Sequence, residues 1–212
     1  MSNIKLVHSG GNSVSLTTPT SNPSSNVTFK LPAADGSSGQ ILQTDGNGNL
    51  TFVDKPTPGI TQADQWRVTS SFDAADSDVT SNWARNNTDF ALIGSGMTES
   101  SGIFTFPATG IYKVEWVVNA FRMPSGATLR QIGGYIYTTI DNSSYNIRAK
   151  GSNSITTDNY ATINSYQSLI FDVTNTSTHK VKFGVFAEDT MRYEGTSDKN
   201  TTHATFIRLG DT

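Results

Sequence analysis

Clustered carboxylates are the first feature of this chain that could do chemistry. Asp73, Asp76 and Asp78 lie close together in the sequence, and Asp89 follows a short distance later. Neighbouring carboxylates repel one another, so such a group can recruit a hard cation through its oxygen ligands. A solvated acidic loop has the same composition and is the favoured interpretation. We therefore expect no metal, and these four aspartates are the place where one would bind.

A second acidic segment, residues 45–49 (Asp-Gly-Asn-Gly-Asn), begins like a calcium-binding loop because oxygen ligands stand at alternate positions. The pattern then fails. Leu50 stands where such loops need glycine, and Pro56 stands where they need a bidentate glutamate. Because an Asp-Gly dipeptide is typical of a hairpin turn, a turn is the interpretation that the sequence favours.

The residues needed for covalent or acid–base catalysis are scattered. His8, His179 and His203 lie far apart, the chain has no cysteine, and no Gly-x-Ser-x-Gly nucleophile motif occurs. A carboxylate pair for glycoside hydrolysis would form only in three dimensions, and nothing in the sequence points to one. We therefore expect a protein that is not an enzyme and that needs no cofactor.

Tyrosine is the remaining side chain with binding chemistry, since it combines a large apolar ring with a polar tip. Residues near the predicted loops are candidates for contact with a ligand, and they are Tyr145, Tyr160, Arg192 and Tyr193. Tyr135 and Tyr137 lie on a predicted inner strand instead. For these two tyrosines a place at a subunit interface is the favoured role.

Composition limits the kinds of partner. The 212-residue chain has 35% hydrophobic residues, a net charge of −3 and a pI near 5.5. Lysine and arginine are scattered without a basic stripe, so nucleic acid is not expected as a partner. No apolar run approaches the roughly 18 residues that cross a bilayer, and no signal peptide is visible, so we expect synthesis in a cytoplasm without membrane insertion. The low apolar content predicts a small core, completed by burial between subunits.

Residues 61–212 read as an all-β domain. Strands are predicted at 66–69, 90–93, 102–106, 112–120, 132–140, 169–173, 181–185 and 204–209. The strand 112–120 alternates between an apolar and a more polar face. The strand 132–140 is apolar on both faces, which fits an interior or subunit-facing position. No helical period persists, so the predicted fold class is all-β.

The first sixty residues divide into three parts. Residues 1–25 are rich in Ser, Thr, Asn, Gly and Pro. They read either as a disordered tail or as an extended arm that orders by adding a strand to a partner. Residues 26–53 predict a small module that is too small to be stable alone. Its three strands are 26–32, 40–44 and 49–53, joined by turns that contain Asp-Gly. Residues 54–60 contain two prolines and read as a stiff linker.

Four short motifs occur in order in the second part of the chain. They are 102–107 (Gly-Ile-Phe-Thr-Phe-Pro), 110–114 (Gly-Ile-Tyr-Lys-Val), 180–183 (Lys-Val-Lys-Phe) and 205–209 (Thr-Phe-Ile-Arg-Leu). This arrangement resembles the C1q/TNF-like jelly roll. The resemblance implies a ten-stranded sandwich of two sheets over residues 61–212, which trimerises through aromatic and aliphatic side chains. The expected interface residues are Ile132, Tyr135, Ile136, Tyr137 and Phe206. The chain lacks the Gly-X-Y stalk of collagen-linked C1q proteins, so only the fold and the trimer carry over.

The contiguous segment 31–52 runs from Leu31 through two Asp-Gly turns to Phe52. It is similar to a segment of virion fibre and appendage proteins of tailed phages, especially marine ones, where it precedes varied C-terminal domains. The resemblance implies that this region attaches the protein to the virus particle. The expected attachment residues are Val27, Phe29, Leu31, Ile41, Leu42, Leu50 and Phe52.

Together these features predict a non-enzymatic structural protein located in a phage virion. We expect a homotrimeric head fibre, decoration protein or small appendage, anchored to a capsid or tail protein by residues 1–53 with the jelly roll projecting outward. The alternative is a tail-associated protein that recognises a host surface glycan or protein. A glycan-degrading enzyme is a third class, and it would need two carboxylates about 5–10 Å apart in a groove.

Overall fold

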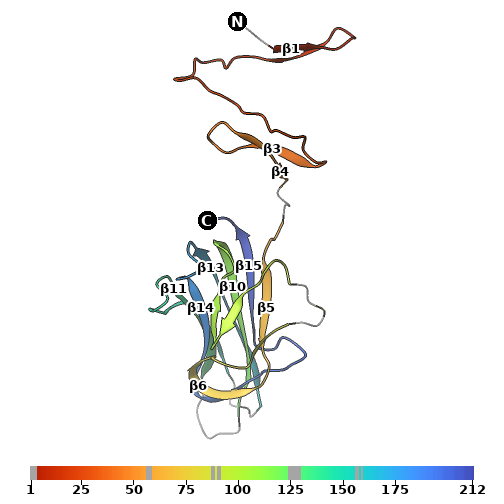
Figure 1. The fold of residues 1–212 in the computed structure, drawn as a ribbon. Helices are drawn as coiled ribbons and strands as arrows, with labels where there is room; N and C mark the ends of the chain where they lie inside the picture. The colour runs from red at the N-terminus through yellow and green to blue at the C-terminus, as the bar shows by residue number, and fades with distance from the viewer. Residues whose placement is uncertain are drawn as a thin grey trace. The chain divides into compact units, whose positions relative to one another are not determined.

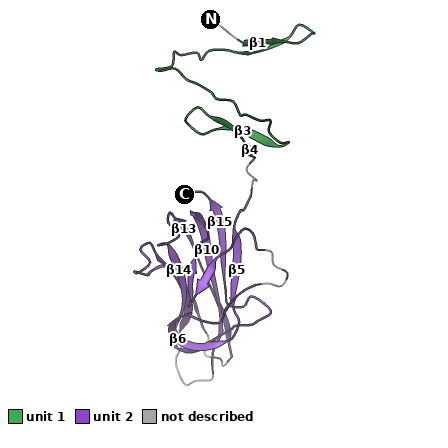
Figure 2. Cartoon of the chain, in the orientation of Figure 1, with its two compact units in different colours: residues 1–58 green, residues 59–212 purple. Residues whose placement is uncertain are grey.

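The computed structural model describes residues 4–55, 59–86, 89, 92–123, 130–155, 158 and 160–212. The chain separates into two compact units, residues 1–58 and 59–212 (Figure 2). The boundary falls inside the segment 54–60 that was predicted as a linker, of which residues 56–58 lie outside the described residues. Within the described part of the chain there is no helix that could cross a membrane.

The first unit contains two antiparallel hairpins (Figure 1). In one, β1 (Ile4–Val7) pairs with β2 (Ser13–Leu16), and in the other, β3 (Gln40–Thr44) pairs with β4 (Leu50–Asp54). The turn of the second hairpin is held by Asp45. Hydrogen bonds from the side chain of Asn49 and the backbone N–H of Asn47 keep the pKa of Asp45 below its usual value. The segment 45–49 is thus the turn that the sequence favoured.

Two predictions for the first unit are wrong. Residues 4–16 form a local hairpin, not a tail or a single extended arm, because the backbone folds back at Gly11, whose φ is +92°. Residues 26–32 form no strand, and only Lys30 makes an isolated bridge, to Asn49. Alternating side chains are present in that segment, but no neighbouring strand pairs with its length. Val27, Phe29 and Leu31 are accordingly 62–77% exposed.

The second unit is built entirely from strands and their connections in its described residues. The strands are β5 (Ala63–Val68), β6 (Phe72–Asp78), β7 (Trp83–Arg85), β8 (Thr98–Ser100), β9 (Ile103–Thr105), β10 (Gly110–Phe121), β11 (Gln131–Thr139), β12 (Asn146–Ser154), β13 (Thr162–Val173), β14 (Lys180–Tyr193) and β15 (His203–Gly210). The all-β prediction is therefore confirmed. Of the predicted strand 90–93, Phe90 and Ala91 lie outside the described residues, and Ile93 makes an isolated bridge to Ala63.

These strands form two layers (Figure 1). In sheet I the order is β7-β5-β15-β10-β13. In sheet II, β14 pairs with β11, which pairs with β12, and the other edge of β14 pairs with β6 and β9. The two layers join where Ala120 and Phe121 of β10 pair with Tyr193 and Arg192 of β14. A sandwich of this kind buries the inward side chains of both sheets.

The core lies between the two sheets and is rich in aromatic rings. Along β10 every second residue from Tyr112 to Ala120 is buried, as its alternation predicted. Phe104 of β9 lies 5.4 Å from Phe183 and 5.3 Å from Phe206 between ring centroids. The indole N–H of Trp116 donates to the carbonyl oxygen of Gly184 at 3.0 Å, which satisfies its polar group inside the core. A single chain thus has an extensive core of its own, which corrects the expectation of a small one.

Candidate functional site

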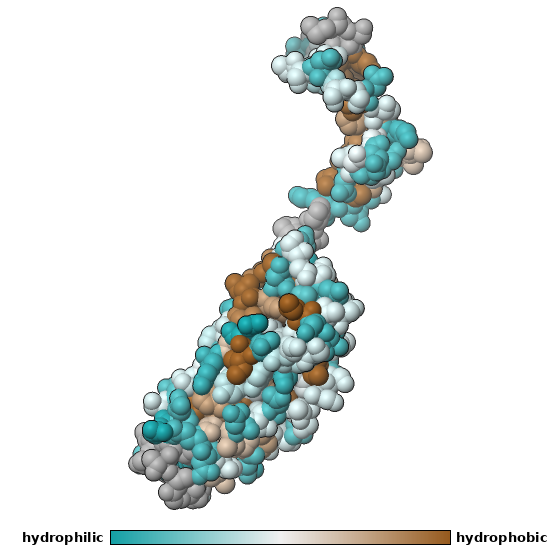
Figure 3. Space-filling model, turned by 90° about the vertical axis from the view of Figure 1, so that its left-hand side faces the viewer, coloured by the Kyte–Doolittle hydropathy of each residue, from teal (hydrophilic) through white to brown (hydrophobic). Residues whose placement is uncertain are grey.

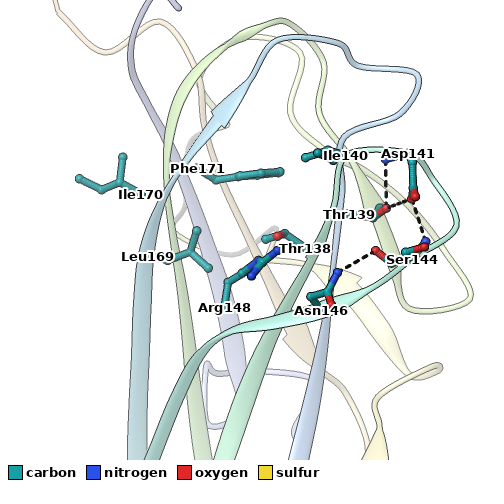
Figure 4. A pocket seen from close by; sticks show the side chains of 10 residues that line it. All are labelled: Thr138, Thr139, Ile140, Asp141, Ser144, Asn146, Arg148, Leu169, Ile170 and Phe171. Atoms are coloured by element: carbon teal, nitrogen blue, oxygen red, sulfur yellow. Dashed lines mark hydrogen bonds between the residues drawn. The ribbon is translucent and has the colours of Figure 1, made fainter.

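A cavity of about 480 Å³ lies beside the ends of β11 and β13 (Figure 4). The β11–β12 connection and the start of β12 form one wall, and the end of β13 forms the other. The lining residues are Thr138, Thr139, Ile140, Asp141, Ser144, Asn146, Arg148, Leu169, Ile170 and Phe171. Residues distant in the sequence therefore meet at one site.

Asp141 organises the loop that bounds the cavity. Its carboxylate accepts hydrogen bonds from the backbone N–H of Ser144 at 2.8 Å, the hydroxyl of Thr139 at 2.7 Å and the backbone N–H of Ser143 at 2.9 Å. These donors favour the charged form and hold the pKa of Asp141 far below its usual value. The carboxylate therefore stays ionised at neutral pH and is committed to the turn.

Arg148 supplies the cationic group of the cavity. Its side chain extends toward Thr138 (Figure 4), and it has no ion-pair or hydrogen-bond partner among the described residues. Leu169 and Phe171 form an apolar wall nearby, while Ile170 points to the opposite side of β13. The site can hold an anionic group next to an apolar one. Since Asp141 is the only carboxylate in the lining, the cavity lacks the carboxylate pair of a glycosidase.

Tyr135 and Tyr137 meet on the outer surface of sheet II. Tyr135 stacks on Phe186 with ring centroids 4.7 Å apart and contacts Tyr137 at 5.6 Å. The ammonium of Lys150 lies 4.3 Å from the Phe186 ring centroid, and that of Lys182 lies 4.8 Å from the Tyr137 ring. Neighbouring rings and ammonium groups thus occupy the ring faces. The cluster is a packed surface layer and not an open platform for a ligand.

The structure does not bring the four predicted ligand-contact residues together. Tyr145 joins the cluster on sheet II, where its ring lies 5.1 Å from the ammonium of Lys182. Tyr193 is fully buried and stacks on Phe72, so its assignment to a ligand surface is wrong. Arg192 is half-buried and pairs with Asp73, and Tyr160 is 65% exposed. Tyr193 is buried because it stands at an inward-facing position of β14. The last residue of a strand still follows the alternation of its side chains.

The carboxylates Asp73, Asp76 and Asp78 lie on strand β6 and not in a loop. Asp73 and Asp78 form ion pairs with Arg192 and Lys182 of the adjacent β14. Burial, followed by the charges of Asp78 and Asp76, raises the pKa of Tyr137 to about 12. Asp89 has a φ of 55°, and its neighbours in the sequence lie outside the described residues. Among the described residues no group of three or more His, Cys, Asp or Glu could hold a metal ion.

Three of the predicted interface residues need correction. Ile132 and Ile136 are 0% exposed and Phe206 is 1% exposed in the single chain, because they occupy the inward phase of β11 and β15. Their surface is already covered, so a second copy cannot contact them. Tyr135 and Tyr137 are half-buried on the outward phase, and their place at an interface stays a prediction.

Sequence reasoning missed the exposed apolar residues of sheet I. Ile170 is 67% exposed, and across the sheet its row continues through Lys113 and Ile207 to Ala63. Leu209 of β15 is 53% exposed. Figure 3 shows hydrophobic patches at the surface of the second unit. The missed signal is that Ile170 stands in the phase opposite to Leu169 and Phe171, where a solvated strand would carry a polar residue.

The same outer face of sheet I carries a polar network. Glu115 accepts a hydrogen bond from the hydroxyl of Tyr166 at 2.6 Å and pairs with the ammonium of Lys113 at 2.6 Å. Burial alone would raise the pKa of Glu115, but the hydrogen bonds from Lys113 and Tyr166 outweigh it and lower that pKa. The network keeps the carboxylate charged on this face of the sheet.

The predicted attachment residues are exposed or half-buried in the first unit. Val27, Phe29 and Leu31 lie in the segment without strand pairing, and the other four lie on β3 and β4. On the hairpin, Leu42 faces Phe52, whereas Ile41 faces Val53 on the opposite side. The seven residues therefore do not share a single face, and their role in attachment stays a prediction.

Two solved structures are similar to this chain. The crystal structure of murine APRIL at pH 5.0 matches with a TM-score of 0.51 at 14% sequence identity, over 70% of this chain and 98% of that one. The structure of Eiger TNF from S. frugiperda matches with a TM-score of 0.54 at 11% identity, over 73% of this chain and 96% of that one. No protein-family profile matches the chain. No curated protein sequence matches it either.

At these identities the likeness shows the fold alone. The eleven strands of the described second unit, the two layers and these two neighbours define a TNF-like jelly roll. The fold class predicted from the sequence is thereby confirmed. A fold does not define a function by itself, because function depends on the sites and surfaces that the chain presents.

Proposed function

We propose that this chain is a non-enzymatic structural protein of a tailed-phage virion. In this proposal it is a homotrimeric head fibre, decoration protein or small appendage. Residues 1–53 attach it to a capsid or tail protein, and the jelly roll projects outward.

The burial pattern of the first unit carries the proposal. None of the described residues 4–55 is buried. The exposed large hydrophobic side chains of this unit are Ile4, Leu6, Val7, Val14, Leu16, Val27, Phe29, Leu31, Ile41, Leu42 and Phe52. Isolated two-stranded hairpins are marginally stable in water, and exposed apolar groups of this number need a partner to cover them. A segment of this kind suits attachment to another polypeptide.

Two observations support the trimer. The TNF-like fold agrees with the resemblance that implied three-fold assembly. The outer face of sheet I also offers exposed apolar residues, Ile170 and Leu209, that a second copy could cover. The interface in this proposal therefore involves sheet I, since Ile132, Ile136 and Phe206 serve the core of each chain.

Attachment is tested on virions assembled with variants of the full chain. Phe29→Asp places a charge at an exposed apolar position, and Thr28→Asp is the matched control at the exposed neighbouring position. We expect Phe29→Asp to lower the copies per virion by at least about tenfold, because burying an unpaired charge costs more than about 1.4 kcal/mol. Thr28→Asp should leave the copy number near that of the wild type.

Quantitative mass spectrometry of purified virions gives the copy number, and cryo-electron microscopy of the same particles locates the protein. Sedimentation of each free variant shows whether its assembly state is unchanged. Equal copy numbers for Phe29→Asp and the wild type would contradict attachment through this segment, and absence of the wild-type protein from virions would overturn the proposed function.

A further inference from the structure

The β1–β2 hairpin has one face made only of aliphatic side chains and one mixed face. Cross-strand pairing joins Ile4 to Leu16 and Leu6 to Val14, so these four side chains share one side, which we call the hairpin face. Each is 65–72% exposed. The pairs Lys5–Ser15 and Val7–Ser13 lie on the opposite side, which is polar except for Val7, a residue that is 63% exposed. The hairpin is therefore amphipathic, and among the described residues of the first unit none buries its aliphatic side.

The hairpin face needs a cover to be stable. Two short strands supply few hydrogen bonds and no buried side chain, which leaves the ordering entropy of the backbone uncompensated. Cross-strand pairs of Ile, Leu and Val contribute only when water is removed from them. A folded β1–β2 hairpin therefore indicates that something packs against Ile4, Leu6, Val14 and Leu16.

The charges of the first unit allow another copy of the same hairpin to act as that cover. The hairpin face is made only of aliphatic side chains, and the single lysine of the two strands, Lys5, points to the other side. Residues 4–55 contain Lys5, Lys30 and Lys55 against Asp35, Asp45 and Asp54, so the charges of the described first unit cancel. Copies of this unit therefore approach one another without net repulsion.

The linkage of the hairpins within one trimer favours another copy of the hairpin as the cover. If the jelly rolls form a trimer, the three hairpins belong to one particle and meet at an effective concentration of about millimolar. A free protein partner rarely reaches that concentration. Two-stranded hairpins also keep open strand edges, and these edges can pair with a neighbouring copy.

We propose that the β1–β2 hairpins of one trimer pack their hairpin faces together and form a second contact between the chains, separate from the jelly roll. This inference rests on the proposed trimer. It narrows the attachment segment of the proposed function from residues 1–53 to residues 26–53, because residues 4–16 then pack against copies of themselves.

Cysteine cross-linking in the full chain tests the contact, because the wild-type chain has no cysteine. Val14→Cys places a thiol on the hairpin face, and Ser15→Cys places one on the opposite face of the same strand. Both positions are exposed, so neither change removes a buried group. A short bismaleimide reagent then joins thiols of different chains when they lie close together.

We expect Val14→Cys to give at least about fivefold more cross-linked dimer than Ser15→Cys, because side chains at successive strand positions point to opposite faces. The yield should not change on dilution, since the contact lies within one trimer. Addition of Leu6→Asp to Val14→Cys should remove the excess, whereas addition of Lys5→Asp, on the opposite face, should keep it.

Sedimentation of the same variants separates the two levels of the proposal. Equal cross-linking of the two variants in a chain that sediments as a trimer overturns the packed hairpin faces and leaves the proposed trimer intact. A chain that sediments as a monomer overturns the trimer and this inference with it. Cross-linking of Val14→Cys to a different virion protein in particles also overturns the inference, since the occupant is then that protein.

Discussion

At the scale of single residues, Asp64 shows how one buried side chain organises its surroundings. Its carboxylate is 2% exposed and accepts hydrogen bonds from Arg85 Nε at 2.9 Å, Trp66 Nε1 at 2.9 Å and the backbone N–H of Met97 at 2.7 Å. It thereby ties β5 to β7 and to the segment before β8. Buried charges need such a complete set of partners to be tolerated. The sequence does not single out Asp64, because two of its partners, Arg85 and Met97, are distant along the chain.

His203 links the stability of the jelly roll to pH. Burial lowers the pKa of this residue below its usual value, although a hydrogen bond with the Thr201 carbonyl and the charge of Glu115 act in the opposite direction. Between that lowered value and the unfolded value of about 6.5, the unfolded chain binds more protons than the folded chain. The stability that the neutral His203 contributes is therefore complete above about pH 6.5. The free energy of unfolding then falls as the pH drops through this window.

Urea denaturation at pH 7.5 and 5.5 measures the effect. We expect the midpoint of the wild type to fall between these pH values, and His203→Gln to remove most of that fall. The carboxyl groups with lowered pKa values, such as Glu115 and Glu188, titrate below this window. An equal fall in both proteins would show that His203 is not the group responsible.

At the scale of strands, close backbone approach constrains sheet II. A Cβ atom added at Gly133 would lie 2.0 Å from the carbonyl oxygen of Gly151 and 2.5 Å from the ring of Phe186. The carbonyl belongs to the paired strand β12, so it cannot move without opening the ladder. Phe186 lies against β11 because this position has no side chain.

Gly133→Ala should therefore destabilise the jelly roll by roughly 1–3 kcal/mol, the usual cost of overpacking. Gly210→Ala is the matched control, since an added Cβ at Gly210 has nothing within 4 Å. Urea midpoints at constant pH compare the two variants with the wild type. If both variants unfold at the wild-type midpoint, the close approach at Gly133 carries no cost and the packing described for Phe186 is wrong.

Strand prediction from the sequence succeeded where apolar and polar residues alternate strongly. It failed where a segment forms a strand only because a neighbouring strand is available to pair with it. The alternation in β10 predicted its buried face correctly. By contrast, β6 carries three aspartates and β12 is polar along most of its length. Neither strand therefore shows the apolar alternation from which a strand is predicted. They form because β14 and β11 offer open edges to pair with. The segment 26–32 shows the reverse, since it alternates but has no neighbour along its length.

At the scale of the whole molecule, the exposed apolar residues of sheet I predict how the chains assemble. Ile170→Asp places a charge in the exposed apolar row of sheet I, where the side chain is 67% exposed and the fold of the single chain does not depend on it. We expect this variant to sediment as a monomer of 22.8 kDa, whereas the wild type should have three times that mass. The new carboxylate has to be desolvated at the interface, and Lys113 opposite it is already paired with Glu115, so the cost is several kcal/mol and is enough to dissociate a trimer.

Thr98→Asp, at an exposed position of β8, is the control and should leave the trimer unchanged. Circular dichroism of both variants checks that the jelly roll stays folded. A trimeric Ile170→Asp would move the interface away from this row.

The jelly roll was predictable because its motifs occur in order along the sequence, whereas the cavity was not. Its lining joins residues 138–148 to residues 169–171 across the two layers, and only pairing in space brings Arg148 near Leu169. The sequence also did not predict which isoleucine side chains are exposed. Ile132 and Ile170 are the same residue type, but the first is 0% and the second 67% exposed, because they stand in opposite phases of their strands.

The position of β15 has a consequence for synthesis of the protein. This strand, His203–Gly210, lies between β10 and β5, which are separated from it by much of the chain. A nascent polypeptide that has not yet reached Gly210 therefore holds β5 and β10 with a missing strand between them and bare edges on both. Such edges invite aggregation until they are filled. The ribosome must therefore deliver nearly the whole unit before sheet I can close, and folding of this layer waits for the last of its strands to be translated.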